Sequence, residues 1–229
     1  MDIEIVKLFI EVGLLTGAGA LLLLAGYRGL LFLEELARAK LINSHHEAMD
    51  RRDEITPKVE TILHDTRLAA GNADCCFTME KHNGTVSVGG LAFMFMTCYY
   101  EVVDGKWQSN KESRERMPLS RYHTLVRKIK DEDYLVLDAD KRIEGLEPVV
   151  YATLENWNIH RSIFVKLQNV DGLMIGFLGL DYGEEKTNKM REDDLTENIK
   201  IAKEAASRIG TLLSLEIADI KARRKVFNR

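Results

Sequence analysis

IHRSIFVKLQNVDGLMIGFLGLDY, residues 159–182, is the stretch that decides the fold. It contains two apolar segments, Ile159–Leu167 and Leu173–Tyr182, joined by the turn-like residues Asn169–Gly172. β-Branched and aromatic residues favour strands, whereas Asn, Asp and Gly favour tight turns. The stretch therefore predicts a β-hairpin of two antiparallel strands.

The sequence around this hairpin predicts further strands and helices. A turn is expected at His82–Gly84, between two upstream strands, and Thr56 is expected to cap a helix that starts at Pro57. Two stretches of mixed charge, Lys106–Arg116 and Glu184–Asp194, indicate solvated loops. The expected strands are Asp74–Lys81, Leu91–Val103 and Tyr134–Leu137, and the expected helices are 57–70, Leu119–Ile129 and Pro148–Asn156.

The last segment, Arg191–Val226, predicts one long helix. Its apolar residues recur at steps of three or four, which defines a continuous stripe along one face. One interpretation is that the stripe packs on the domain's own first helix and sheet. The other is that it forms the seam of a dimer, which predicts a homo-oligomer. The stripe consists of Leu195, Ile199, Ala202, Ala206, Ile209, Leu213, Ile217 and Ile220.

The amino-terminal residues 1–33 predict a transmembrane anchor helix. Val12–Tyr27 carries no charge, but it spans only about 24 Å at 1.5 Å per residue, and a bilayer core is about 30 Å thick. Leu8–Leu33 is long enough if Glu11 and Arg28 reach opposite interfaces. The acidic start argues against a cleaved signal peptide, while burial of this helix in a protein assembly remains the alternative.

The charges that flank the anchor predict its orientation. Acidic residues dominate before it, and Arg28, Arg38 and Lys40 follow it. Positive charge tends to stay on the cytoplasmic side, so we expect a single-pass membrane protein with a cytoplasmic carboxy-terminal domain. Residues 34–54 are expected to continue as a juxtamembrane helix, and residues 55–229 to form the domain. Membrane lipid is therefore an expected partner.

The composition limits the classes of function. The net charge of −4 gives no support for nucleic-acid binding, which usually shows a basic surplus. Cys75, Cys76 and Cys98 are an odd set without a Cys-x-x-Cys spacing, which suggests free thiols in a reducing compartment. The histidines show no metal-ligand spacing, so neither a metal site nor a cofactor is expected.

The order of the predicted elements resembles that of a GAF domain, an α/β small-molecule sensor module. Asp74–Gly84 and Tyr100–Val103 resemble its first two strands, and Asn158–Phe164 with Gly176–Tyr182 resembles its last two, including the ending GxLxLD. The resemblance covers about residues 55–215. It implies an α/β (α+β) fold, with an antiparallel sheet flanked by long N- and C-terminal helices. Some small phage-encoded proteins have a similar layout of anchor and GAF-like domain.

In GAF domains the ligand lies between the sheet and the variable helices. The resemblance thus implies that residues on the second strand, near the first turn and around the start of the hairpin line a pocket, although ordinary core packing is the alternative for the aromatic ones. The candidate ligand-binding residues are His82, Phe93, Phe95, Tyr99, Trp157 and Arg161. The Asn-Lys-Phe-Asp-Glu motif of nucleotide-binding GAF domains does not occur, so cyclic-nucleotide binding is not implied.

These observations predict a non-enzymatic, membrane-anchored sensor or docking module that self-associates through its helices. Its partners would be a small-molecule ligand or a protein. One alternative is a structural component of a phage particle or host-takeover assembly. A more distant one is a thiol-dependent methionine sulfoxide reductase, because some GAF-like enzymes use pocket cysteines and the chain carries Cys75, Cys76 and Cys98.

Overall fold

The computed structural model describes Lys7, residues 52–86 and residues 92–227. The chain divides into two units, Met1–Arg52 and Asp53–Arg229. The predicted anchor (residues 1–33) and most of the juxtamembrane helix (residues 34–54) lie outside the described residues. Within the described part, none of the helices has the length and apolarity that crossing a bilayer requires. The strands of the described residues all belong to the second unit.

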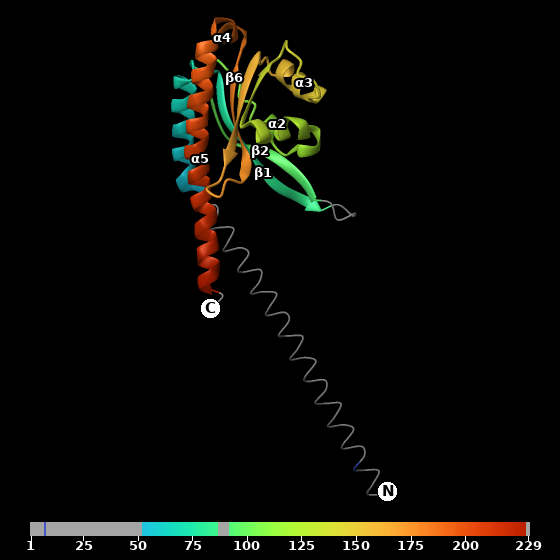
Figure 1. Cartoon of the computed structure of the whole chain (residues 1–229). Coiled ribbons are helices and arrows are strands. Elements are labelled where there is room, and N and C mark those ends of the chain that lie inside the picture. The colour runs from blue at the N-terminus through green and yellow to red at the C-terminus, as the bar shows by residue number, and fades with distance from the viewer. Residues whose placement is uncertain (1–6, 8–51, 87–91, 228–229) are drawn as a thin grey trace. The chain divides into compact units, whose positions relative to one another are not determined.

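A six-stranded antiparallel sheet forms the centre of this unit (Figure 1). The strand order is β3-β2-β1-β6-β5-β4. The hairpin predicted at residues 159–182 is confirmed, because β5 pairs antiparallel with β6. β6 also pairs with β1, which places the carboxy-terminal hairpin against the amino-terminal one. The strands are β1 (Cys75–Val86), β2 (Ala92–Val103), β3 (Met117–Pro118), β4 (Tyr134–Asp138), β5 (Arg161–Gln168) and β6 (Met174–Tyr182).

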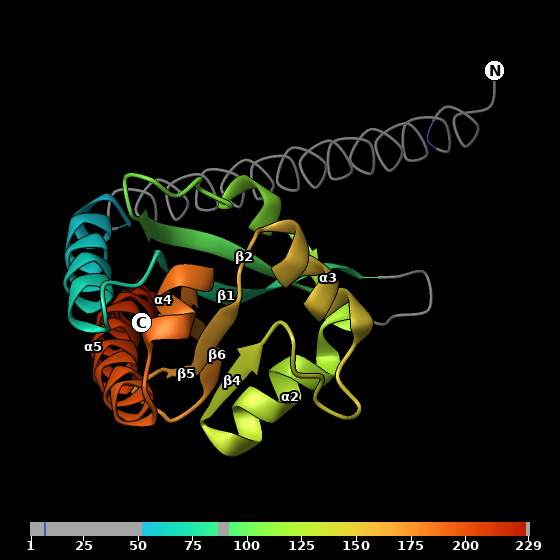
Figure 2. The same cartoon turned by 90° about the horizontal axis from the view of Figure 1, so that it is seen from above.

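The helices lie on both faces of the sheet (Figure 2). One face is covered by residues 52–69, which are helical, and by α5 (Glu192–Phe227). The other is covered by α2 (His123–Glu132) and α3 (Pro148–Asn156). Short elements complete the chain: η1 (Glu112–Arg114), η2 (Leu119–Arg121) and α4 (Glu184–Lys189).

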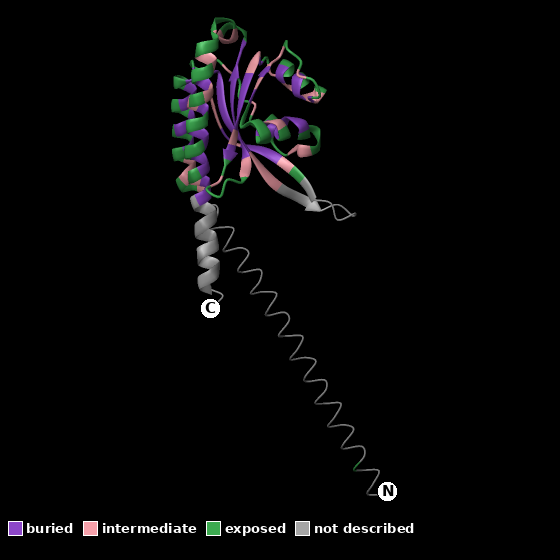
Figure 3. Ribbon diagram, viewed as in Figure 1, coloured by how far each residue is buried: buried purple, intermediate pink, exposed green. Residues whose placement is uncertain are grey.

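Each face of the sheet carries its own hydrophobic core, as the burial colours show (Figure 3). The core under the helix pair of residues 52–69 and α5 includes Val59, Leu63, Ala206 and Ile209. Because strand side chains alternate between faces, the adjacent Cys75 and Cys76 enter different cores. In a sheet with only one covered face, one of these two cysteines would be exposed. Here both are buried, because helices cover both faces of the sheet.

The apolar stripe of α5 packs within the domain over the part whose side chains are described. Ala202, Ala206, Ile209 and Leu213 are buried against the sheet and residues 52–69. Small residues allow a close approach here: a Cβ on Gly210 would lie 2.0 Å from the carbonyl oxygen of Gln168 in β5. This part of the stripe follows the first interpretation, in which the helix packs on its own sheet.

Three local predictions are wrong. β1 continues through His82–Gly84 to Val86, with a register irregularity after Asn83, so these residues form no turn. The helix already includes residue 52, so Thr56 does not cap its start. Part of the expected loop at Glu184–Asp194 is α4, whose first turn is acidic and whose last turn is basic, as the helix dipole favours.

Candidate functional site

A small cavity lies on the face of the sheet that α2 and α3 cover. Its volume is about 50 Å³, and β1, β2, β6, α2 and α3 all contribute to its lining. The lining is apolar apart from a few groups, among them Arg114, Asp181 and Ser162. Small-molecule sites in proteins usually measure about 300–1,000 Å³, so the cavity as it stands has room only for water.

Arg114 fills the polar side of this cavity. Only 2% of the residue is exposed. One guanidinium nitrogen, Nη1, donates to Glu101 Oε1 at 3.0 Å, and the other, Nη2, donates to Asp181 Oδ2 at 2.5 Å. These two carboxylates come from the ends of β2 and β6, so Arg114 links two strands that are not neighbours in the sheet.

Two aromatic rings complete the surroundings of the guanidinium. Its Cζ lies 3.7 Å from the centroid of the Phe77 ring and 4.8 Å from that of Trp157. A cation at these distances from an aromatic face is attracted by the ring quadrupole, most strongly where water is excluded. Glu101, Asp181, Phe77 and Trp157 therefore form a cage around one cation, and we call these four residues the cation cage.

The charges within the cage favour a bound cation. Burial by itself lowers the pKa of Arg114, but the negative charges of Asp181 and Glu101 outweigh it, and the pKa lies above its ordinary value. Burial raises the pKa of Asp181, while Arg114 and the Ser162 hydroxyl, which donates to Asp181 at 2.6 Å, oppose that rise. Arg114 is thus permanently charged, and it faces two carboxyl groups rather than one.

The cysteines near the cage are poor nucleophiles. All three are free and buried. Burial raises the pKa of the Cys98 thiol to about 12, and it also raises the pKa values of Cys75 and Cys76. Cys75 Sγ lies 3.6 Å from Arg114 Nη1, yet burial outweighs this positive charge. Since the thiolate is the reactive form, these values argue against the thiol-reductase alternative.

Of the six candidate ligand-binding residues, Trp157 lines the cavity. His82, Phe95 and Tyr99 are brought together elsewhere: the His82 ring stacks on Phe95 at 6.0 Å and meets Tyr99 edge-on at 6.4 Å. His82 Nε2 is also 2.8 Å from Thr97 Oγ1. Tyr99 packs against the core under the helix pair. These three residues therefore lie away from the cavity.

Of the remaining two candidates, Arg161 does not line the cavity. Arg161 is half-buried, pairs with Asp138 through Nε and Nη2, and approaches Met190 Sδ at 3.5 Å with Nη1. It ties β5 to β4. Phe93 lies in β2, and its side chain is outside the described residues. Tyr122, which was not among the six candidates, lines the cavity, and its hydroxyl lies 3.4 Å from Thr153 Oγ1.

Sequence reasoning missed Arg114, because it lies in the charged stretch that we interpreted as a solvated loop. That interpretation is wrong for this one residue: its neighbours Ser113 and Glu115 are exposed, whereas Arg114 is buried. A signal for it did exist. Glu101 and Asp181 lie in otherwise apolar strands, and buried carboxylates require a cation or several donors.

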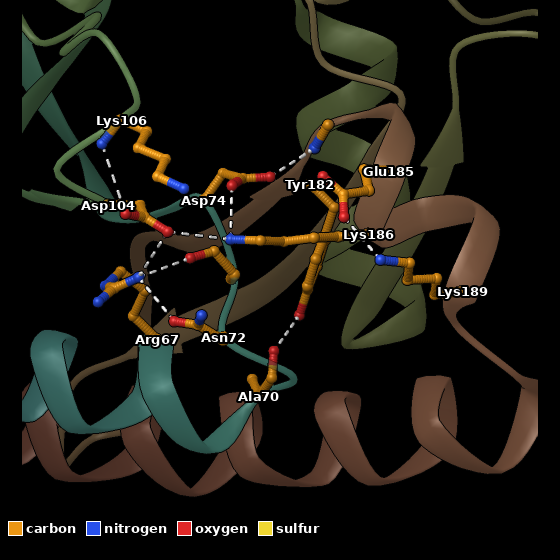
Figure 4. A network of polar contacts seen from close by, with 12 residues as sticks. Arg67, Ala70, Asn72, Asp74, Asp104, Lys106, Tyr182, Glu185, Lys186 and Lys189 are labelled. Carbon is orange, nitrogen blue, oxygen red and sulfur yellow. Dashed lines mark hydrogen bonds and ion pairs between the residues drawn. The ribbon is translucent and has the colours of Figure 1, made fainter.

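A second polar network connects residues that flank β1, β2 and β6 with the helix of residues 52–69 (Figure 4). Lys186 Nζ lies 2.6 Å from Asp74 Oδ1 and 3.2 Å from Asp104 Oδ2. Arg67 Nη1 donates to the carbonyl oxygen of Ala73 at 3.0 Å, and the Tyr182 hydroxyl donates to that of Ala70 at 2.9 Å. The network joins the helix of residues 52–69 to β1, β2, β6 and α4, and we assign it a structural role.

No cluster of residues suited to hold a metal ion occurs among the described residues. The polar chemistry of the cavity is therefore that of the cation cage. It holds a positively charged planar group, the guanidinium of Arg114. The raised pKa values of the three cysteines disfavour the thiolate form that would attack a substrate.

Comparisons with known proteins agree with this architecture. No protein-family model and no curated protein sequence matches the chain. Among solved structures, it is similar to the blue-light-absorbing form of the PixJ GAF domain from Thermosynechococcus elongatus, with a TM-score of 0.50 and 14% identity over 76% of this chain and 95% of that one. The described unit thus has a GAF-like fold, as the sequence pattern predicted.

A further similar structure is the photoproduct state of GAF3 from Slr1393 of Synechocystis sp. PCC6803. Its TM-score is 0.48, with 14% identity over 74% of this chain and 98% of that one.

Proposed function

We propose that this chain is a non-enzymatic sensor or docking module with a GAF-like domain, held at the cytoplasmic face of a membrane by residues 1–33. The observation that carries the proposal is the division of the sheet into two covered faces. One face holds a small cavity that contains a buried ion-pair cluster, and the other holds a pair of long helices. One layer of strands therefore separates the cavity from the helix pair.

The shared strands provide the physical connection between the two faces. β6 contributes Asp181 to the cation cage, while Leu180 and Tyr182, on either side of it, belong to the core under the helices. A shift of β6 that follows a change at Asp181 would alter the packing of α5, because close-packed interiors transmit small displacements. This arrangement supports sensing more than catalysis, for which the buried thiols are poorly suited.

We further propose that two copies associate through the outer surface of the helix pair. A groove of about 560 Å³ runs between residues 52–69 and α5. Its apolar members are Ile62 and Leu212, with Lys58 and Arg208 beside them. Ala202, Ala206, Ile209 and Leu213 of the α5 stripe already pack within the domain, so we assign the partner to this groove on the outer side of the helix pair.

Membrane fractionation of the full-length chain tests the first half of the proposal. We expect the full chain in the membrane pellet after an alkaline wash, and a chain lacking residues 1–33 in the supernatant. Recovery of both forms in the supernatant would contradict membrane anchoring. Recovery of the full chain in purified phage particles would instead favour the structural-component alternative, for which no described feature argues.

Chemical cross-linking of the full chain tests self-association. Ser207→Arg adds a positive charge beside Lys58 and Arg208 in the groove, and we expect it to lower the yield of cross-linked dimer. Thr196→Arg is the matched control, because it adds the same side chain at an exposed position on α5 outside the groove. Equal dimer yields for the two variants would show that the groove is not the interface.

A further inference from the structure

The segment between β2 and β3 carries the occupant of the cation cage. From Lys111 to Arg116 every residue is exposed except Arg114. The segment turns inward at η1, where the Arg114 amide donates to the carbonyl oxygens of Lys111 and Asn110 at 3.0 and 3.1 Å. The guanidinium thus enters the cavity from a surface loop, in the way that an arginine side chain of a separate ligand would.

The charges of the cage decide what could replace this occupant. Without a cation, Glu101 and Asp181 would be left buried and uncompensated, and breaking a buried ion pair is strongly unfavourable. A neutral ligand cannot remove that cost. An anion meets two carboxyl groups for one guanidinium and finds no surplus positive charge. Only a cationic ligand can take the place of Arg114.

The shape of the cage narrows the class of cation. Its two carboxylates accept from two different nitrogens of one guanidinium, and the Phe77 ring lies against the guanidinium. A planar, delocalised cation with several fixed donors fits this arrangement, whereas a compact ammonium ion has no flat face and no fork of donors. Guanidinium and amidinium groups meet both requirements.

We propose that the cation cage is a binding site for guanidino or amidino compounds, in which Arg114 acts as a tethered occupant that such a ligand displaces. Displacement would release the segment of residues 104–116 from the cavity and leave room that the resident side chain now fills. Such compounds would be the ligands in the sensing role proposed above, and their biological relevance rests on that role, whereas their binding to the cage does not.

Arg114→Ala tests the proposal because it removes the guanidinium and leaves the four residues of the cation cage unchanged. In the full chain, we expect this variant to lose on the order of 10 °C of its thermal midpoint. Ethylguanidinium, at about 20 mM, should restore several degrees of that loss through binding to the folded form alone. Ethylurea, which has nearly the same shape without the charge, should restore none.

A second variant controls for the possibility that Arg114→Ala does not fold. Arg114→Ala combined with Glu101→Gln and Asp181→Asn removes the uncompensated charges, so it should fold and show no stabilisation by ethylguanidinium. If Arg114→Ala alone gains nothing from ethylguanidinium, whether it is folded or not, the cage does not accept a free cation and the proposal is overturned.

The wild-type chain provides the test of displacement. Because Arg114 is a tethered competitor, displacement requires more ethylguanidinium than binding to Arg114→Ala does, and at such concentrations hydrogen exchange of the backbone amides in residues 104–116 should become faster. Ethylurea should not have this effect. Unchanged exchange in that segment would contradict displacement. Neither result bears on membrane anchoring, which fractionation tests separately.

Discussion

Arg114, Glu101 and Asp181 are the residues on which the cavity depends. Together they place three ionisable groups in an apolar interior, with side-chain exposures of 1–2%. The attraction between buried charges is offset by the loss of hydration, so such a group adds little net stability over an apolar core. The buried cluster instead fixes which side chains contact one another. Removing any one of its three residues leaves an uncompensated charge and lowers the free energy of unfolding.

Asp181→Asn removes one charge while keeping the shape of the side chain. Because it leaves the Arg114 guanidinium only partly compensated, we expect a loss of about 3 kcal/mol in the free energy of unfolding, measured in urea. Glu197→Gln is the control: it breaks an exposed pair with Lys200 and should cost less than about 0.5 kcal/mol. Similar small losses in both variants would show that Arg114 does not depend on Asp181.

At the residue scale, the sequence identified Trp157 and missed Arg114. Trp157 was a candidate through the resemblance to GAF domains, and it lines the cavity, although its role as a ligand-binding residue stays a prediction. The burial of one arginine in an otherwise exposed stretch depends on carboxylates 13 and 67 positions away in the sequence. No local periodicity carries that information, although the two buried carboxylates indicate that some cation is needed.

Among the elements, α2 begins in an unusual way. Its own N-cap residue, Tyr122, provides no side-chain cap. Instead Glu147, which directly precedes α3, accepts the backbone N–H groups of Thr124 and Leu125 at 2.5 and 3.3 Å. Burial acts to raise the pKa of Glu147, but these N–H donors outweigh it and hold the pKa below its ordinary value of 4.5.

Glu147→Gln should therefore cost about 1 kcal/mol at neutral pH, the usual effect of losing a helix cap. A carboxyl group whose pKa is lower in the folded state stabilises the fold above its unfolded pKa and ceases to do so as the pH falls through the folded value. The difference between wild type and variant should shrink below about pH 4. Urea unfolding at neutral and acid pH measures it, and a constant difference would refute the capping role.

The prediction of elements succeeded where a repeat was long or a turn was distinct. β5, β6, α3 and α5 lie within two residues of their predicted bounds. β3 has only two residues and therefore shows no periodicity. The turn predicted at His82–Gly84 failed because Asn-Gly is also compatible with a strand irregularity. Where β1 ends depends on its pairing with β2, and a local sequence pattern does not reveal that.

At the scale of the whole molecule, the helix layer depends on a close approach of α5 to β5. Gly210→Ala would place a Cβ 2.0 Å from a backbone oxygen of Gln168, and neither backbone can yield easily. We expect a loss of about 1–3 kcal/mol, although alanine is the better helix former. Gly105→Ala is the control, since its Cβ would meet nothing within 4 Å and should change little. Equal stabilities would mean that α5 does not pack so closely.

The Arg114 guanidinium is held rigidly inside a cation cage that connects β2, β6 and the segment before β3. Arginine-selective ¹⁵N NMR of the full chain tests whether it is. We predict one guanidinium with separate, slowly exchanging Nη signals, because hydrogen bonds to two fixed carboxylates restrict rotation. These signals should disappear in Arg114→Ala and shift in Asp181→Asn. If the signals that Arg114→Ala removes are instead averaged and exchange rapidly, the guanidinium is not held in this way.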